Sequence, residues 1–179
     1  AQEVYGKAPN AAEISKSLET ETITDDDMYN EAAYMLWRFM ALYPQNPLSD
    51  DSAFTMVNIN LDKEDYEESL SLCNQYTVRY PESDYHSSFQ YMKALSLFLM
   101  RRYSEAVSTA EIVAEGESDD ENLANYILGQ IFHTERKPAE AINYYRRVEE
   151  IFPDAKEAIE YFEAKSISME EVTNFKPGD

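Results

Sequence analysis

The sequence contains few glycines, few basic residues and one cysteine, and each shortage argues against a class of protein. Its 179 residues include 4 Gly and a single cysteine, Cys73. The isolated glycines form no phosphate-binding loop or dinucleotide fingerprint. One cysteine cannot form an internal disulfide, so we expect Cys73 to be a small buried hydrophobe. The apolar runs, such as Leu97–Met100, are far shorter than the ~20 residues that span a bilayer, so no membrane-spanning segment is predicted.

Acidic residues outnumber basic residues by more than two to one. The sequence has 35 Asp and Glu against 15 Lys and Arg, which gives a net charge of −20. Nucleic acids and anionic membrane surfaces bind clustered Lys and Arg, so the charge argues against both. A protein or peptide partner of basic or neutral character suits this charge better.

Many of the carboxylates lie immediately before or at the start of expected helices. There they accept hydrogen bonds from unpaired N–H groups and interact favourably with the helix dipole. This group comprises Asp25–Asp27, Asp50, Asp51, Asp65, Asp84, Asp119, Asp120 and Asp154. None of these clusters has the Asp-x-Asp-x-Asp-Gly spacing of a calcium loop. We therefore interpret them as helix caps and predict no metal site.

Patterns that carry catalysis are also missing. His86 and His133 lie far apart in the sequence, without a His-Glu-x-x-His motif or a second ligand at zinc spacing. No nucleophile elbow is present. We expect a protein that is not an enzyme and has no cofactor.

Four segments of the sequence follow one template: Tyr29–Pro44, Tyr66–Pro81, Tyr103–Ser118 and Pro138–Pro153. A small residue near the start of each recurs at intervals of 37, 37 and 35 residues, as Ala32, Ser69, Ala106 and Ala141. A period in this range is typical of stacked helix pairs.

Each segment fits one helix, and a second helix fits between consecutive segments. In the last segment Ala141, Tyr145 and Val148 form an apolar stripe at helical spacing. Similar patterns lie between the segments, at Ala53–Leu61, Met92–Phe98 and Leu123–Phe132. The connections are short and polar, as antiparallel helical hairpins require: Asp62–Asp65, Arg101–Arg102 and Thr134–Lys137. The chain thus alternates a helix A and a helix B. We expect close backbone approach where these helices cross, at Gly129, Ala94, Ala32, Ala106 and Ala141.

These residues resemble the tetratricopeptide repeat, whose pattern includes Leu-Gly, spaced aromatics, Ala and a closing Pro. The fourth repeat matches best, with Leu128, Gly129, Phe132, Ala141, Tyr145 and Pro153. The resemblance implies an all-α fold, a right-handed α-solenoid of about 3.5–4 antiparallel helix pairs plus a closing helix. The long periods and the Tyr-Pro and Phe-Pro endings are similar to repeats of bacterial envelope proteins, which favours the periplasm or cell envelope over the cytoplasm.

The resemblance places a partner-binding groove on the concave face, which helix A builds. Nine residues are expected to line it: Phe54, Asn58, Leu61, Tyr91, Leu95, Phe98, Tyr126, Gln130 and His133. Aromatic rings with neighbouring amides suit an extended or helical peptide. Chaperone-linked members hold a terminal carboxylate with Lys, Asn and Arg, and no cation stands among these nine residues. The alternative is that they pack against neighbouring helices or a flanking domain.

The two ends differ from the middle. We expect an N-terminal arm or imperfect first helix over residues 1–24, a solenoid over residues 25–166 and a tail over residues 167–179. Within the solenoid, Asp154–Ser166 is predicted to be the closing helix. The tail segment Glu171–Asp179 has a strand-and-turn pattern. It is similar to the segment that joins such repeats to macroglobulin-like β-domains in large bacterial envelope proteins.

Two functional classes remain open from the sequence. The first is a non-catalytic scaffold that binds a protein or peptide partner in the groove. The second is a structural spacer or self-associating module within a larger multidomain protein. They differ in whether the groove aromatics contact a partner or hold the fold together.

Overall fold

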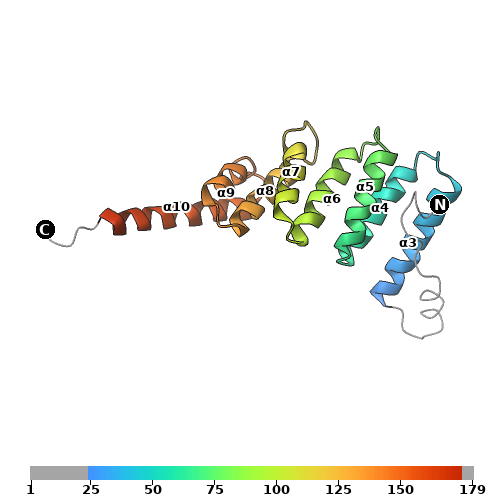
Figure 1. Cartoon of the computed structure of the whole chain (residues 1–179), viewed down its shortest axis with the longest axis horizontal. Coiled ribbons are helices and arrows are strands. Elements are labelled where there is room, and N and C mark those ends of the chain that lie inside the picture. Colours follow the sequence, from blue (N-terminus) through green and yellow to red (C-terminus); the bar gives the residue numbers. More distant parts are fainter. Residues whose placement is uncertain (1–23, 175–179) are drawn as a thin grey trace. The chain divides into compact units, whose positions relative to one another are not determined.

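The computed structural model describes residues 24–174, and the surroundings of side chains as far as Ser166. Over this range the chain forms eight helices and no strand (Figure 1), which confirms the all-α prediction. The helices are α3 (Asp25–Leu42), α4 (Ser49–Asp62), α5 (Tyr66–Arg79), α6 (His86–Leu99), α7 (Tyr103–Ala114), α8 (Glu121–Thr134), α9 (Pro138–Tyr145) and α10 (Pro153–Asn174). Of the expected N-terminal arm, residues 1–23 lie outside the described range.

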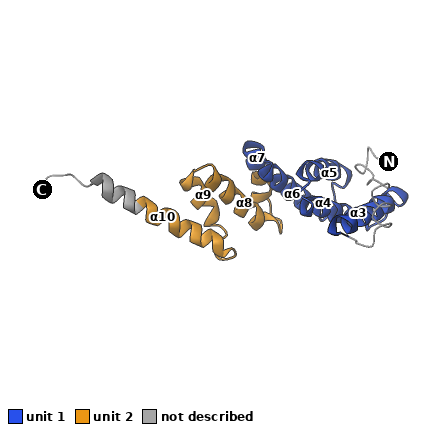
Figure 2. Cartoon of the chain, turned by 90° about the horizontal axis from the view of Figure 1, so that it is seen from below, with its two compact units in different colours: residues 1–109 blue, residues 110–179 orange. Residues whose placement is uncertain are grey.

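Internal contacts divide the chain into two compact units, residues 1–109 and 110–179 (Figure 2). The boundary falls within α7. In the first unit α3 packs on α4, α4 on α5, and α5 on α6. In the second unit α8 packs on α9 and α9 on α10. Helices that are consecutive in sequence are therefore neighbours in space inside each unit, as in a helical repeat stack.

Helices A and B alternate as the sequence predicts. Helix A corresponds to α4, α6 and α8, and helix B to α3, α5, α7 and α9. The closing helix is α10, which begins at Pro153 and extends beyond the predicted end at Ser166.

The three turns from helix A to helix B share one backbone conformation. Glu64, Arg101 and Arg136 have φ of 58°, 61° and 60°, in the left-handed region. The amide of the following residue reaches back to close each helix, as in the 2.8 Å bond from Asp65 N to Asn60 O. This is a Schellman closure, which usually has glycine at the left-handed position. This conformation was not predictable from the sequence, because all three residues are charged and none is glycine.

Carboxylates cap some of the helices, as predicted. Thr24 and Asp27 form a capping box at the start of α3, with a 3.0 Å bond from the Thr24 amide to Asp27 Oδ2. Asp65 Oδ1 accepts a 3.2 Å bond from the Glu68 amide at the start of α5. Asp120, at the N-cap of α8, makes no capping bond through its side chain.

The core of the first unit lies between α3, α4, α5 and α6. Its fully buried side chains include Met40, Val57, Cys73, Tyr76 and Phe89. The Tyr76 hydroxyl donates to Met56 Sδ at 3.3 Å, and its ring lies 5.7 Å from that of Phe89. Burial of one phenol against a sulfur and a second ring lets helix B fill the wide gap between two A helices without an unpaired hydroxyl.

The core of the second unit depends on one small residue against one large residue. Gly129 of α8 and Tyr145 of α9 are both buried. A Cβ atom built on Gly129 would overlap Cδ1 of the Tyr145 ring and would lie 2.9 Å from Cγ. The ring therefore occupies the space that a side chain at position 129 would need, as expected for a helix crossing. Val148, Ala155 and Ile159 complete the core.

Three expectations about local structure were wrong. Ala32 is exposed, whereas its template equivalents Ser69, Ala106 and Ala141 are fully buried. Ala32 thus lies at no packed crossing within the described residues. The segment Pro138–Pro153 was expected to form one helix. Helix α9 instead ends at Tyr145, because the following amides donate to carbonyls only three residues back, as Val148 N does to Tyr145 O at 3.0 Å.

The strand predicted at the C-terminus is the third. Helix α10 continues to Asn174, so the first residues of Glu171–Asp179 are helical. Phe175–Asp179 lie outside the described range. The β-forming character of Val172 and Thr173 is thus overridden in a chain that continues a long helix. The prediction of a following β-domain is not tested by this finding.

We predict that Gly129→Ala destabilises the protein by about 1–3 kcal/mol, because the new methyl group must displace the buried Tyr145 ring. In an uncrowded helix interior the same change stabilises. Chemical denaturation of both proteins measures the difference. The matched control is Gly116→Ala, whose Cβ would lie 3.4 Å from Val113 O in ordinary contact. Equal effects of the two substitutions would contradict the close crossing.

We predict that Cys73 does not react with thiol reagents in the folded protein at pH 8. Burial raises the pKa of its thiol to about 12, so the reactive thiolate is scarce below that pH. The reaction should be complete after denaturation in guanidinium chloride. A matched control is Val78→Cys on the same helix, because Val78 is 80% exposed. Rapid labelling of native Cys73 would show that it lies outside the core.

Candidate functional site

Six of the nine predicted groove residues lie in the first unit, and all six are half-buried: Phe54, Asn58, Leu61, Tyr91, Leu95 and Phe98. The Phe54 ring stacks on the Tyr85 ring at 4.5 Å. Asn58 turns back to its own helix, where Nδ2 donates to Phe54 O at 3.0 Å. The Phe98 ring lies 6.0 Å from that of Tyr103. Much of the surface of these side chains is therefore covered by contacts within their own unit.

The remaining three predicted residues lie on α8 in the second unit. The Tyr126 ring stacks on Phe152 at 4.5 Å and lies 6.0 Å from the Tyr145 ring. Burial, together with the charge of Asp154, raises the pKa of Tyr126, so its phenol stays protonated at neutral pH. Gln130 lies one helical turn further along α8, and both residues are half-buried.

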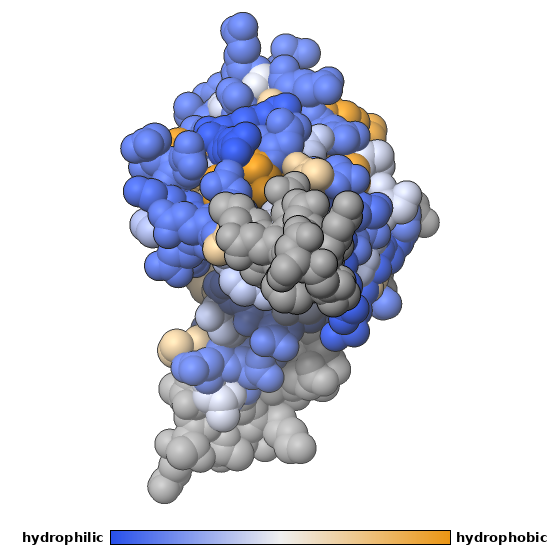
Figure 3. Space-filling model, turned by 90° about the vertical axis from the view of Figure 1, so that its left-hand side faces the viewer, coloured by the Kyte–Doolittle hydropathy of each residue, from blue (hydrophilic) through white to orange (hydrophobic). Residues whose placement is uncertain are grey.

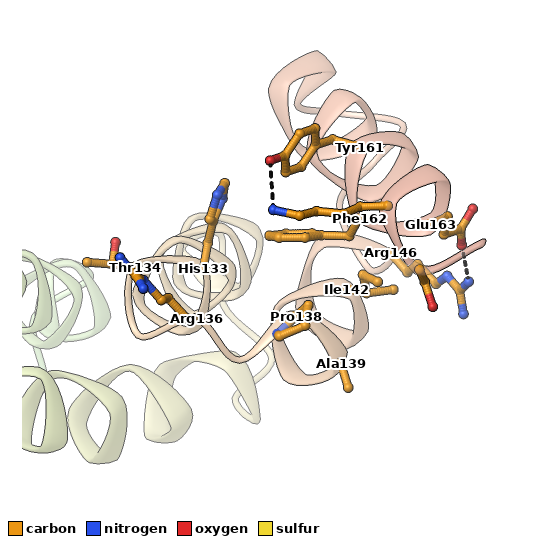
Figure 4. Close-up of a pocket in the computed structure, with 12 residues that line it drawn as sticks. His133, Thr134, Arg136, Pro138, Ala139, Ile142, Arg146, Tyr161, Phe162 and Glu163 are labelled. Carbon is orange, nitrogen blue, oxygen red and sulfur yellow. Dashed lines mark hydrogen bonds and ion pairs between the residues drawn. The ribbon is translucent and has the colours of Figure 1, made fainter. Parts of the chain in front are cut away.

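His133 differs from the other eight because it is exposed. It lies near the end of α8, and its ring meets Phe162 of α10 edge to face at 4.7 Å (Figure 4). It also lines an open hollow of about 1080 Å³ in the second unit. His133 is the one predicted groove residue among the residues that line this hollow.

Three segments of the second unit line the hollow. The end of α8 and the following turn contribute His133, Thr134 and Arg136; α9 contributes Pro138, Ala139 and Ile142, followed directly by Arg146; and α10 contributes Tyr161, Phe162, Glu163, Lys165 and Ser166. Figure 4 shows Phe162 and Ile142 next to one another, with His133 across from them. These three form the apolar and aromatic part of the wall.

Charged groups surround this apolar part. Arg146 and Glu163 form an ion pair at 2.7 Å, and both side chains are about half exposed. Lys165 Nζ lies 5.5 Å from the centre of the Tyr161 ring and 3.4 Å from its hydroxyl. With Arg136, the lining has three cations and one carboxylate. The hollow is therefore locally cationic in a strongly acidic chain.

Sequence reasoning missed the α9 and α10 side of this hollow. Phe162 lies in Asp154–Ser166, which the sequence predicts to be the helix that closes the solenoid and packs on the last helix pair. The missed signal is the set of cations near it, Arg136, Arg146 and Lys165, in a sequence with few cations. They lie on three different segments, so only the fold brings them together.

Neither a metal-ligand cluster nor a membrane-spanning helix is present among the described residues. Within it, no three His, Cys, Asp or Glu side chains come together as a metal site. None of the helices in the described range has the length and apolar character that crossing a membrane requires.

Comparison with known proteins gives a match to one repeat family. The family model of the tetratricopeptide repeat matches residues 124–155. No curated protein and no solved structure gives a significant match. The matched residues run from α8 through α9 to the start of α10, which is the repeat whose sequence fits the pattern best. The segment that forms the hollow's α8 and α9 walls thus carries a tetratricopeptide repeat, and this supports a tetratricopeptide-repeat protein.

Proposed function

We propose that this protein is a non-catalytic scaffold that binds a peptide segment of a partner protein in the hollow between α8, α9 and α10. Tetratricopeptide repeats generally mediate protein–protein interactions, and a repeat of this kind spans residues 124–155. The observation that carries the proposal is the hollow itself. It combines aromatic side chains with three cationic side chains in one unit.

The apolar wall supports binding of one apolar side chain of the peptide. Phe162 and Ile142 are half-buried, so they can be covered further without a change in fold. His133 meets Phe162 at an interplanar angle of 70°. An apolar side chain placed against these groups would be desolvated on several sides, which is the arrangement of binding hot spots. Figure 3, a view from the α10 side, shows small apolar areas surrounded by hydrophilic surface.

The charges around the wall favour a peptide with a carboxylate near that apolar side chain. Arg136, Arg146 and Lys165 supply three cations to the lining, against the single carboxylate of Glu163. The net charge of −20 favours a basic or neutral partner for the chain as a whole. The local charge of the hollow is opposite, and local charge determines which groups pair on binding. An acidic and apolar motif on a partner that is not itself strongly acidic satisfies both conditions.

The predicted groove residues remain part of this proposal only where their rings are accessible. His133 contributes directly. Tyr126, on the same helix as His133, would support a longer peptide through its exposed edge. Phe54, Tyr91 and Phe98 lie in the first unit and would contact a peptide there separately. Their stacking within each unit instead favours a second candidate, a structural spacer or self-associating module in a larger protein. The bacterial envelope setting and the larger macroglobulin-containing protein remain proposals from the sequence resemblance.

We predict that selection of a random peptide library on the full chain enriches peptides that combine Asp or Glu with an aliphatic or aromatic residue. Binding of a selected, fluorescently labelled peptide should weaken about tenfold in Arg146→Glu, because a cation in the hollow becomes a carboxylate. Fluorescence polarisation measures this change. The substitution breaks only an exposed ion pair, so stability should change by less than ~1 kcal/mol.

The matched control is Lys156→Glu, which makes the same charge change on the exposed surface of α10 but outside the hollow. Binding to this variant should equal that of the unaltered protein. Equal losses in both variants would show that overall charge governs the affinity. Failure to enrich any peptide that competes at the hollow would favour the spacer.

A further inference from the structure

Helix α3 exposes a row of large apolar side chains. Met28, Met35 and Leu42 are 58%, 63% and 59% exposed, and they are spaced by seven residues. Residues at this spacing lie along one side of a helix. Ala32 and the half-buried Phe39 lie between them on the same side. We call this set of five residues the α3 stripe.

The α3 stripe corresponds to surface that is buried elsewhere in the repeats. Met35 occupies the template position of Leu72, which is 1% exposed, and Ala32 that of Ser69, which is fully buried. In α5 these residues face other helices of the unit. In α3 the fully buried Met40 faces the core of the unit, and among the stripe residues Phe39 also packs against that core. A surface of the repeat is therefore without its usual cover within the described residues.

The start of α3 departs from the repeat spacing. Helices α5, α7 and α9 each begin three residues before their template residue, whereas α3 begins seven residues before Ala32. The position that corresponds to the left-handed turn residue Glu64 is Asp27, which is helical and belongs to the capping box with Thr24. The turn that leads a helix A back onto its helix B is thus replaced by helix.

The α3 stripe is self-complementary in charge. Glu31 and Arg38 flank it on one side, both exposed, and neither forms an ion pair with another described residue. When two such helices pair in antiparallel orientation, flanking residues on the same side face one another. Glu31 of one copy then lies opposite Arg38 of the other, and the two-fold axis repeats this pair.

From this geometry we infer that α3 pairs with α3 of a second copy of the chain, antiparallel, about a two-fold axis near Met35. The small side chain of Ala32 allows the two backbones to approach, and Met28 of each copy lies opposite Leu42 of the other. A two-fold pairing uses the same surface on both copies and therefore closes as a dimer. The net charge of −20 on each copy opposes association. Moderate salt should therefore strengthen the dimer by screening this repulsion, whereas high salt should weaken it by screening the Glu31–Arg38 pairs.

Sedimentation velocity of the full chain, from micromolar to several hundred micromolar protein, tests this inference. We expect a reversible monomer–dimer equilibrium. Met35→Glu should raise the dimer dissociation constant at least tenfold, because it places two carboxylates at the axis. Arg38→Glu should raise it about tenfold, and adding Glu31→Arg to that variant should restore most of the affinity, because the pair is then reversed.

The matched control is Val78→Glu, a change at an exposed apolar residue of α5, which should leave the dissociation constant unaltered. Circular dichroism confirms that each variant folds. A chain that stays monomeric over the whole range overturns the inference and leaves another cover for the α3 stripe. A dimer that tolerates Met35→Glu overturns it as well. Neither result bears on peptide binding in the hollow of the second unit.

Discussion

Packing of a large ring into the space left by a small residue is the interaction on which the repeats depend. In the second unit Tyr145 fills the space beside Gly129. In the first unit Tyr76 fills the gap beside Met56 and Phe89, while Ser69 and Ser96 meet at 2.9 Å where two backbones approach. Neighbouring helices can cross closely only when large and small side chains alternate along them. The regular spacing of small residues in the sequence results from this constraint.

The same constraint explains where a binding surface can form. Rings that fill gaps between helices are already covered, which is why Phe54 and Tyr126 stack on Tyr85 and Phe152. A partner needs surface that the stack leaves open. In the second unit that surface lies beside Phe162, where α9 stops at Tyr145 and α10 begins after a series of turns. On α3 it lies around Met35, where no described helix covers the stripe.

Most helices were predictable from the sequence, because apolar spacing determines which side of a helix is buried. Gly129 was predictable as a crossing for the same reason. The left-handed turns at Glu64, Arg101 and Arg136 were not, because charged residues carry no signal for that conformation. The exposure of Ala32 depends on what precedes α3, which the template alone cannot show. Of the candidate site, His133 was predicted, whereas Arg146 and Lys165 were not, because their proximity arises from the fold.

A double-mutant cycle between Gly129 and Tyr145 tests the central interaction most directly. The free energy of unfolding is measured for the unaltered chain, for Gly129→Ala, for Tyr145→Ala and for the double variant. If the ring fills the space beside Gly129, the cost of Gly129→Ala disappears in the Tyr145→Ala background, which gives a coupling of about 1–3 kcal/mol. In that background alanine should even stabilise slightly through its helix propensity. An equal cost of Gly129→Ala in both backgrounds would contradict the account.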